Sequence, residues 1–417
     1  MTQSILWLWY TPFGLGGVET FLLNLSRCAV EDGWGVSIAG IQNADGPLRS
    51  EHGTAVEVLD WSSFSPAYMG KVDPKEALAR IAADLDRIRP SVVAINDCSD
   101  FAIGAADLLR IIRPYCTIID TFHIDPLDNH YFELRNTYTD VLDGVAGTSE
   151  RALQRWRACA RSERLPATKY IRNGVSMPML PRRPFDGVFR LLSVGRVAQK
   201  QKRILELPGV FRSLREAGIR FAATIVGEGE ERAALEAALA ERSLLDVVRL
   251  TGFIPPAEVL PLYYEHDFLL NVSSYEGFSM SVIEALASGC IPLCTDLPNL
   301  DHDIFLDGVN SLLIGVDDLG AITHRLSSLT PQDIETMSQQ AASTGRELTA
   351  AKTWQGYRDF IAGLQAQRPL RAWPADVHSL LDVPWDPTRD NPWLPHPHPL
   401  RRLLNRMLEA AGARKRD

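Results

Sequence analysis

The chain has 417 residues, of which 46% are hydrophobic and 23% are charged, and its formal net charge is −9 at pH 7. This composition is typical of a soluble globular protein of two or three domains, and the acidic balance argues against a general nucleic-acid binder. The longest apolar runs have the length of strands, so no transmembrane helix of about 20 residues is expected. Residues 1–10 lack a secretory signal pattern, and the six cysteines show no metal-binding spacing. Both features favour a cytoplasmic protein with reduced thiols.

Strand and helix patterns alternate over the first 130 residues. Strands are predicted at Ile5–Tyr10, Val36–Ala39, Val92–Ile95 and Thr117–Ile119, and helices at Val18–Glu31 and Pro74–Ile88. Strands that are apolar throughout and separated by helices form parallel sheets covered on both faces. Residues 1–178 are therefore predicted to be a Rossmann-like domain, with ligands at the carboxyl ends of its strands.

A proline-rich segment, Met177–Gly187, is predicted to be the hinge, and the alternating pattern then restarts. Strands are predicted at Phe189–Val194, Phe221–Val226, Val247–Leu250, Leu269–Val272 and Ile291–Cys294, and helices at Arg203–Glu216, Glu230–Ala240 and Met280–Ser288. Residues 188–330 are thus predicted to form a second Rossmann-like domain. The predicted fold class is α/β, with two doubly wound domains that face each other across a cleft.

The C-terminal part has a different composition. Thr330–Leu364 has a mostly helical pattern, and residues 331–366 are expected to pack back across the cleft. Residues 367–417 form a tail rich in proline and tryptophan, which cannot be one long helix and is expected to wrap on a surface. The stretch 400–417 has the pattern of a basic amphipathic helix. Packing on the protein and contact with an anionic membrane both remain open for it.

The most informative window is Asn271–Asp296. A strand ends near Ser273, a loop carries Glu276, Gly277 and Phe278, and a helix begins near Ser279. The backbone amides of the first helical turn (Ser279, Met280, Ser281) are free donors, which makes a helix N-terminus a phosphate site. Glu276 and Glu284 flank this terminus, and carboxylates beside a phosphate are best explained by contacts with hydroxyl groups. The window therefore predicts a nucleotide-sugar pocket.

This window resembles the Glu-x7-Glu element of retaining glycosyltransferases of the two-domain GT-B fold, specifically glycosyltransferase family 4 (group 1). The resemblance covers about residues 3–365 and implies that Glu276 contacts the donor sugar and Glu284 the ribose. It also implies that residues 1–178 are the acceptor-side domain and that residues 188–330 are the nucleotide-sugar-binding domain. A Gly-Arg pair followed by a lysine is a further family pattern. Here it implies that Arg196 and Lys202 clamp the donor diphosphate, with Lys200 as the competing lysine. The alternative is a solvated basic turn.

Other strand ends resemble the family more weakly. Gly16 and Gly17, ahead of Glu19, are similar to a Gly-Gly-x-Glu motif that approaches the donor phosphate from the first domain. His123 resembles a residue that points at the transferred sugar, although a hydrogen-bonded loop histidine fits as well. Gly227 matches a turn beside the nucleotide. Thr251-Gly252-Phe253 matches the turn that reads the base, and Asn173-Gly174 matches an architectural turn ahead of the hinge.

Two features depart from the family or argue against a metal. The usual glycine pair after Ile291–Cys294 is replaced by Asp296-Leu297-Pro298-Asn299. The Asp-x-Asp sequences at Asp84 and at Asp301 lie in a helix and in a loop without a nearby nucleotide site, so no metal and no other cofactor is expected. Arg196 and Lys202 would supply the positive charge that a divalent ion otherwise brings.

The resemblance implies a retaining hexosyltransferase that moves a sugar from a nucleoside-diphosphate donor to an acceptor hydroxyl, in cell-envelope polysaccharide or glycolipid assembly. The expected partners are the donor and a saccharide or lipid-linked acceptor, without nucleic acid. The expected location is the cytoplasm, with peripheral contact at the inner face of the membrane through residues 400–417 as an option. The alternatives are another nucleotide-sugar enzyme (an epimerase or a glycogen-type synthase) and a catalytically idle nucleotide-sugar-binding protein.

Overall fold

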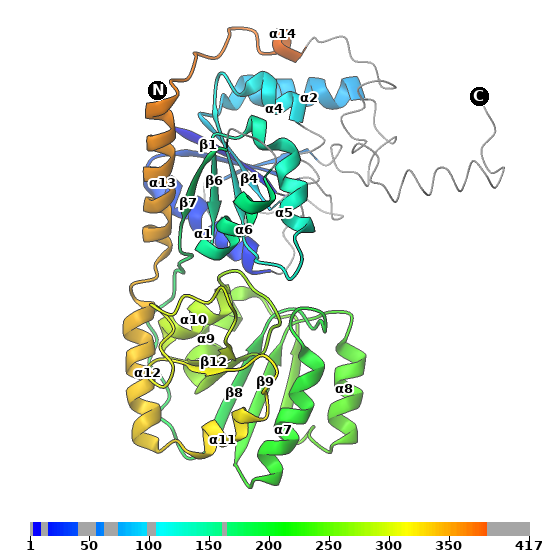
Figure 1. Ribbon diagram of the computed structural model, residues 1–417, viewed down its shortest axis with the longest axis vertical. Helices are drawn as coiled ribbons and strands as arrows, with labels where there is room; N and C mark the ends of the chain where they lie inside the picture. Colours follow the sequence, from blue (N-terminus) through cyan, green and yellow to red (C-terminus); the bar gives the residue numbers. More distant parts are fainter. Residues whose placement is uncertain are drawn as a thin grey trace, which may run out of the picture.

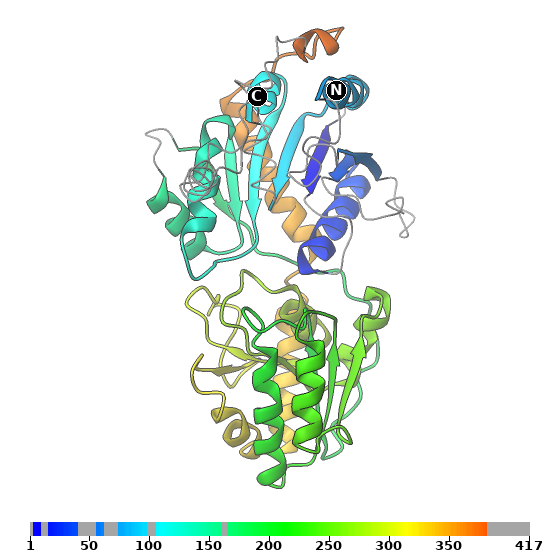
Figure 2. The same ribbon diagram turned by 90° about the vertical axis from the view of Figure 1, so that its right-hand side faces the viewer.

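A computed structural model describes residues 3–9, 16–40, 56–61, 74–97, 106–160 and 165–381. These residues form two α/β lobes that lie one above the other and meet at a narrow waist (Figures 1 and 2). Each lobe contains one parallel sheet with helices on both faces. This is the predicted architecture of two doubly wound domains.

The described part of the N-terminal domain contains a seven-stranded parallel sheet in the order β3-β2-β1-β4-β5-β6-β7. Its strands are β1 Ser4–Trp9, β2 Gly35–Gly40, β3 Glu57–Asp60, β4 Val92–Asn96, β5 Thr117–Phe122, β6 Gly144–Gly147 and β7 Ala167–Tyr170. Its helices are α1 Gly17–Glu31, α2 Pro74–Ile88, α4 Ala106–Ile112, α5 His130–Arg135, η3 Asn136–Val141 and α6 Glu150–Cys159. The strand order reverses between β1 and β4, and open parallel sheets bind ligands at such a switch point.

The C-terminal domain contains a six-stranded parallel sheet in the order β10-β9-β8-β11-β12-β13, with its switch point between β8 and β11. Its strands are β8 Phe189–Val194, β9 Phe221–Val226, β10 Val248–Gly252, β11 Phe268–Asn271, β12 Ile291–Thr295 and β13 Leu312–Ile314. Its helices are η4 Ile204–Glu206, α7 Leu207–Glu216, α8 Arg232–Glu241, α9 Pro256–Glu265, α10 Met280–Ser288, α11 Ala321–Ser327 and α12 Pro331–Gly345.

Over the residues that the structure describes, the chain crosses between the domains twice, and the two crossings run side by side. Val175 pairs with Thr349 in a parallel bridge, and the amide of Ala350 donates to the carbonyl oxygen of Val175. The proline-rich segment that was predicted to be the hinge lies just beyond this point. Arg182 and Arg183 fasten that segment to the end of α9 and to Asp267. The crossing therefore precedes the prolines, because these arginines attach them to the C-terminal domain.

The last helices follow one side of the molecule through both domains (Figure 1). Helix α12 packs on α10 in the C-terminal domain, whereas α13 (Ala350–Gln367) packs on α1 in the N-terminal domain. Trp354 and Arg358 of α13 both bind the carboxylate of Asp32, which directly follows α1. Helix α13 therefore returns to the domain in which the described residues begin.

The beginning of the tail wraps over the N-terminal domain. Trp373 stacks on Tyr115 with ring centroids 5.2 Å apart, and its indole nitrogen donates to the carbonyl oxygen of Pro90 at 3.2 Å. The short helix α14 (His378–Leu381) then contacts α2. The predicted amphipathic helix at 400–417 lies outside the described residues. Within the described residues, no helix is long and apolar enough to cross a membrane.

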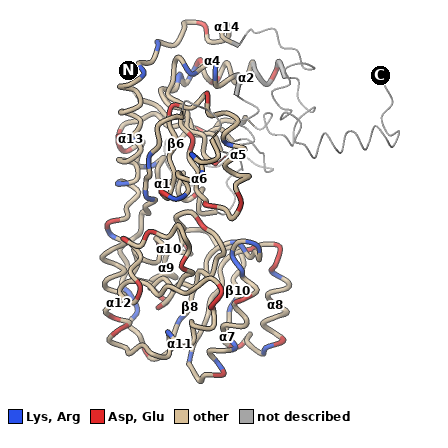
Figure 3. The backbone as a smooth tube through the Cα atoms, viewed as in Figure 1, with Lys and Arg blue, Asp and Glu red and all other residues tan. Residues whose placement is uncertain are grey.

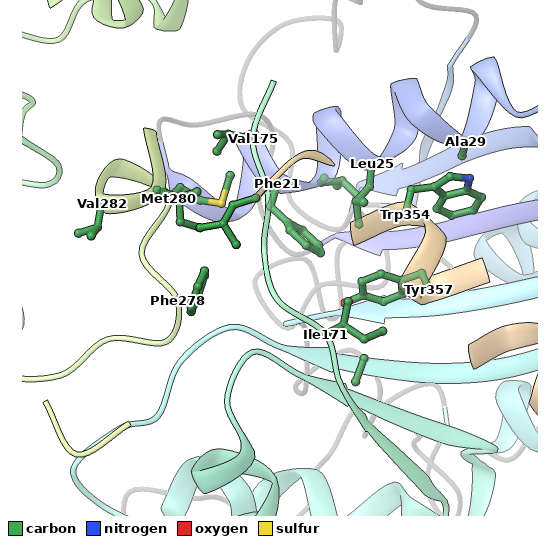
Figure 4. Packing of buried hydrophobic residues seen from close by; sticks show 14 of the residues in the cluster. Phe21, Leu25, Ala29, Ile171, Val175, Phe278, Met280, Val282, Trp354 and Tyr357 are labelled. Atoms are coloured by element: carbon green, nitrogen blue, oxygen red, sulfur yellow. The ribbon is translucent and has the colours of Figure 1, made fainter. Parts of the chain in front are cut away.

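One hydrophobic cluster continues from the first domain into the second. Phe21 and Leu25 of α1 and Tyr357 of α13 belong to it, as do Phe278 and Met280 at the start of α10 (Figure 4). Burial of a large apolar side chain contributes about 1.5–3 kcal/mol. Charged residues, in contrast, are spread along both domains and do not gather in one of them (Figure 3). Apolar packing of this cluster therefore helps to hold the waist together.

Candidate active site

The strongest candidate site lies at the switch point of the C-terminal sheet. Strand β8 ends at Val194 and leads into Gly195 and Arg196, while β11 ends at Asn271 and leads into the loop with Glu276. These two strands are neighbours and parallel, so their carboxyl ends open at the same edge of the sheet. The sequence alone placed each residue at a strand end, and the topology brings the two strand ends together.

Five polar side chains at this edge form a connected cluster, in which Gln201 also contacts Glu276 at 3.4 Å. The ammonium group of Lys202 lies 2.5 Å from Oε1 of Glu276, and the Ser273 hydroxyl donates to the same oxygen at 2.7 Å. Gln201 accepts a hydrogen bond from the guanidinium of Arg196 at 3.0 Å and donates to the carbonyl oxygen of Tyr275 at 3.2 Å. The two predicted cations and the predicted sugar-binding carboxylate therefore belong to one network.

The structure also decides which lysine belongs to this network. Lys202 is four-fifths buried between Gly195 and Glu276, whereas the side chain of Lys200 is exposed. The carbonyl oxygen of Lys200 accepts a hydrogen bond from the Ser274 hydroxyl at 2.9 Å, which fastens the loop without using the ammonium group. Lys202 is thus the cation that lies beside Glu276.

Glycines allow the strand ends to approach each other. Gly227 has φ +134°, and a Cβ there would lie 1.9 Å from the carbonyl oxygen of Gly195. The amide of Gly227 donates to the carbonyl oxygen of Gly252, in the turn predicted to read a base. Phe253, in the same turn, is exposed. Any side chain at 227 would therefore push apart the turns after β8 and β9.

Two helix N-termini meet at the waist. Gly17 begins α1 and Met280 begins α10, and a Cβ on Gly17 would lie 3.2 Å from the Met280 side chain. No side chain caps the N-terminus of α10. Both ends carry partial positive charge, so an anion between them is favoured. The Glu19 carboxylate is used locally, because it accepts the backbone N–H of Gly16 at 2.7 Å.

Two residues of the predicted donor pocket, Phe278 and Met280, have side chains that lie in the core. The Phe278 ring packs near Phe305 with centroids 5.8 Å apart, and Met280 is buried against α1. Their positions at the start of an amphipathic helix require apolar side chains, because this turn lies over the shared hydrophobic cluster (Figure 4). Only their backbone groups are left for contact with a ligand.

Glu284 lies one turn inside α10 with only 9% of its surface exposed. Its Oε2 accepts a hydrogen bond from the hydroxyl of Tyr263 in α9 at 2.7 Å. Burial raises the pKa of Glu284 to about 7, and the Tyr263 hydroxyl opposes that rise. A buried carboxyl that titrates near neutrality is typical of functional sites. Sequence reasoning did not identify Tyr263, because it comes from another helix.

His123 follows β5 at the facing edge of the N-terminal sheet. Its Nε2 lies 2.7 Å from Oδ1 of Asn96, at the end of β4, and its ring meets Phe21 edge-on. Burial, helped by the positive charge of Arg135, lowers the pKa of His123 to about 3. The imidazole is therefore neutral at physiological pH, so it can form hydrogen bonds but carries no charge.

A buried charge cluster behind His123 was not predicted. Arg135 is fully buried and binds Asp120 at 2.7 Å as well as Asp97, with the hydroxyls of Tyr131 and Tyr138 completing the network. Asp97 directly follows β4, and Asp120 lies within β5. Two carboxylates around one arginine compensate the cost of burying these charges.

The two domains touch directly at the candidate site. Ile124 and Gly277 form an antiparallel bridge, and the amide of Asp125 donates to the carbonyl oxygen of Glu276 at 3.1 Å. A Cβ on Gly277 would lie 1.6 Å from the carbonyl oxygen of His123. A glycine at 277 therefore allows this close approach of the N-terminal domain's backbone.

The two Asp-x-Asp sequences have other partners. Asp84 accepts the indole N–H of Trp61, whereas Asp86 pairs with Arg89. Asp301 binds Arg172 at 2.8 Å and the Tyr170 hydroxyl at 2.6 Å, across the waist. Among the described residues, no group of three His, Cys, Asp or Glu side chains is arranged to hold a metal ion.

Comparisons with known proteins agree with this architecture. Residues 188–331 match the family model described as glycosyl transferases group 1. Over 221 residues (51% of this chain, 53% of the relative), the chain is 26% identical to glycogen synthase of Mycobacterium tuberculosis. Over 182 residues (42% and 44%), it is 34% identical to the amylovoran biosynthesis glycosyltransferase AmsK of Erwinia amylovora. The matches thus span about half the length of these relatives.

Solved structures extend the likeness beyond the matched domain. A mutant of S. aureus TarM, in complex with fondaparinux, alpha-GlcNAc-glycerol and UDP, superposes with a TM-score of 0.70. That match covers 86% of this chain and 100% of the TarM chain at 10% identity, and it therefore shows the fold. This chain accordingly carries a group 1 glycosyltransferase domain at residues 188–331, within a two-domain architecture of the GT-B fold.

Proposed function

We propose that this protein is a retaining glycosyltransferase that uses a nucleoside-diphosphate sugar as donor. The observation that supports this most directly is the Arg196–Gln201–Lys202–Glu276 network at the switch point of the C-terminal sheet. It combines two cations for a diphosphate with a carboxylate for sugar hydroxyls. The uncapped N-terminus of α10 adds backbone N–H donors for the same anion.

The proposed reaction needs no nucleophile from the protein. The bond between the anomeric carbon and the diphosphate oxygen breaks, and the acceptor oxygen bonds to that carbon from the same face. The acceptor proton passes to the departing diphosphate. Negative charge grows on the leaving oxygen, so Arg196 and Lys202 would bind the transition state more tightly than the donor. We also propose that these cations make a divalent ion unnecessary.

The acceptor is proposed to be a growing saccharide or a lipid-linked sugar. The relative from Erwinia amylovora is named for the biosynthesis of amylovoran, and the TarM complex holds a glycerol-linked GlcNAc. Both point to a hydroxyl on a larger glycan or glycoconjugate. The neutral His123, whose ring is held by the buried Asn96, is proposed to hydrogen-bond the transferred sugar from the N-terminal domain.

Lys202→Met, with Lys200→Met as the matched control, tests the assignment. A thermal-shift screen with UDP-, GDP-, ADP- and dTDP-sugars first identifies the donor, because a bound donor raises the melting temperature. Loss of one preorganised cation is expected to lower kcat by about 100- to 1,000-fold, while the exposed Lys200 is dispensable.

Equal activity in the two lysine variants would contradict the proposed clamp. NMR of the product then determines the anomeric configuration, and an inverted product would exclude the retaining mechanism. Full activity in EDTA is the expected result for a reaction without a divalent ion, whereas loss that Mg²⁺ restores would oppose it.

A further inference from the structure

Two asparagines hold the donor loop, which is defined here as residues 276–280. The side-chain nitrogen of Asn299 donates to the carbonyl oxygens of Glu276 and Gly277, each at 3.0 Å. The side-chain nitrogen of Asn173 donates to the carbonyl oxygen of Phe278 at 3.1 Å. Three consecutive carbonyl groups of the loop are thus bound by two side-chain amides.

The two asparagines belong to different domains. Asn299 follows β12 and is part of the domain that carries the donor loop. Asn173 lies on the N-terminal side of the crossing. The amide of Ile171 donates to the carbonyl oxygen of Gly147 at the end of β6, and Thr353 of α13 donates its hydroxyl to the carbonyl oxygen of Arg172. These contacts attach the segment before Asn173 to the N-terminal domain.

Only one orientation of the Asn173 side-chain amide allows it to donate to the Phe278 carbonyl oxygen. It is 97% buried, and rotation of the amide by half a turn would set its oxygen against the Phe278 carbonyl oxygen. In the observed orientation Oδ1 has no hydrogen-bond partner among the described residues. A buried acceptor without a partner is destabilising, so stability alone does not account for an asparagine here.

The Asn173 contact is accompanied by the backbone contacts at the waist. The bridge between Ile124 and Gly277 and the hydrogen bond from Asp125 to Glu276 also join the N-terminal domain to the donor loop. If the two domains opened, these contacts and the Asn173 hydrogen bond would break together. The two hydrogen bonds from Asn299 would remain, because they lie within one domain.

We propose that Asn173 is a positioning residue for the donor loop, which sets Glu276 against the donor sugar only when the domains are closed. This inference rests on the proposed function. Asn299 supports the loop in both the open and the closed state, whereas Asn173 supports it in the closed state. Nucleotide binding by the C-terminal domain therefore depends on Asn299, and transfer of the sugar depends on both asparagines.

The experiment compares Asn173→Asp with Asn299→Asp, because aspartate keeps the shape of asparagine and replaces the donating group by an acceptor. Asn173→Asp is expected to lower kcat by about 10- to 100-fold, as small misplacements of reacting groups do. Its dissociation constant for the nucleoside diphosphate should stay within about twofold of wild type. Asn299→Asp is expected to impair both quantities. Asn173→Ala repeats the test without adding a buried charge.

Hydrogen–deuterium exchange of the full chain gives a readout that does not require turnover. Asn173→Asp and Asn173→Ala should speed exchange of the amides in residues 277–280 while protection of β8 and β9 stays at the wild-type level. Unchanged exchange in this loop, unchanged kcat, or an equal loss of nucleotide affinity in the Asn173 and Asn299 variants would overturn the proposal. Failure of the proposed function would look different, since wild type itself would then bind no nucleotide.

Discussion

The ionisation of Glu284 leads to a quantitative prediction for donor binding. Its pKa is raised to about 7 by burial, so the carboxyl is about one-tenth ionised at pH 6 and about nine-tenths ionised at pH 8. If the ionised form accepts hydrogen bonds from the ribose, the affinity for the donor should rise about tenfold from pH 6 to pH 8. That factor corresponds to about 1.4 kcal/mol of binding free energy.

Tyr263 sets the position of this rise. Its hydroxyl donates to Glu284 at 2.7 Å and stabilises the charged form. A hydrogen bond to a charged group contributes about 1.5–3 kcal/mol, so Tyr263→Phe should move the midpoint upward by about one to two pH units. Glu284→Gln cannot ionise and should bind the donor weakly and equally at every pH.

The assay is calorimetric titration with the intact donor at pH 6, 7 and 8. The intact donor is required because its phosphate diesters do not titrate in this range, whereas the terminal phosphate of a free nucleoside diphosphate does. Wild-type affinity that is constant from pH 6 to pH 8 would refute the assigned role of Glu284. A Tyr263→Phe midpoint that stays at the wild-type value would refute the role of the hydrogen bond.

The same carboxyl affects folding with the opposite trend. Its pKa is raised from 4.5 in the unfolded chain to about 7, so the folded state binds the proton more tightly between these values. The contribution of Glu284 to stability therefore falls as pH rises from 4.5 to 7, by up to about 3 kcal/mol. Between pH 6 and pH 7, donor affinity should therefore rise while the contribution of Glu284 to folding stability falls. The opposite signs distinguish the effect on binding from the effect on folding.

Two further predictions concern the waist and the N-terminal core. Gly277→Ala places a Cβ 1.6 Å from the carbonyl oxygen of His123, so initial rates of transfer should fall by at least about 100-fold. Its affinity for the nucleoside diphosphate, measured by calorimetry, should change little. Asp120→Asn weakens the binding of the fully buried Arg135 and should lower the free energy of unfolding of this domain by about 3 kcal/mol in urea denaturation.

Both variants have matched controls in the same chain. Gly209→Ala adds a Cβ that meets no atom within 4 Å, so transfer should continue at the wild-type rate. Asp140→Asn breaks an exposed pair with Arg110, which is worth at most about 1 kcal/mol. A fully active Gly277→Ala enzyme would show that the contact with His123 is unnecessary, and equal destabilisation by the two aspartate changes would show that burial of Arg135 does not matter.

Local sequence patterns were sufficient to predict most of the helices and strands. The helices Pro74–Ile88 and Met280–Ser288 and the strands β8 and β9 have the predicted bounds, because their apolar spacing and flanking residues lie within a short stretch. Strand β6 was missed, since Gly144-Val-Ala-Gly147 has no such pattern. A Cβ on Gly144 would lie 2.6 Å from the Phe360 ring of α13, so a helix far along the chain requires this glycine.

In the candidate site too, some features follow from the local sequence and others only from the folded structure. The sequence placed Glu276, Arg196 and Lys202 at strand ends, since strand ends can be recognised locally. It could not decide between Lys200 and Lys202, because both lie in one turn and only the side facing Glu276 distinguishes them. It also could not show that the side chains of Phe278 and Met280 pack in the cluster at the waist, which leaves only their backbone groups for the donor.

The order of residues by itself determined the two α/β domains and the strand ends at which polar groups gather, because these follow from spacings within one element and its adjoining turn. Only the tertiary structure decided that Tyr263 holds Glu284, that Asn173 holds the donor loop, and that Gly277 meets His123. The two partners of each contact lie far apart in the sequence, so the local pattern around one does not indicate the other. Such contacts are specified by how the sheets, helices and crossings pack in space.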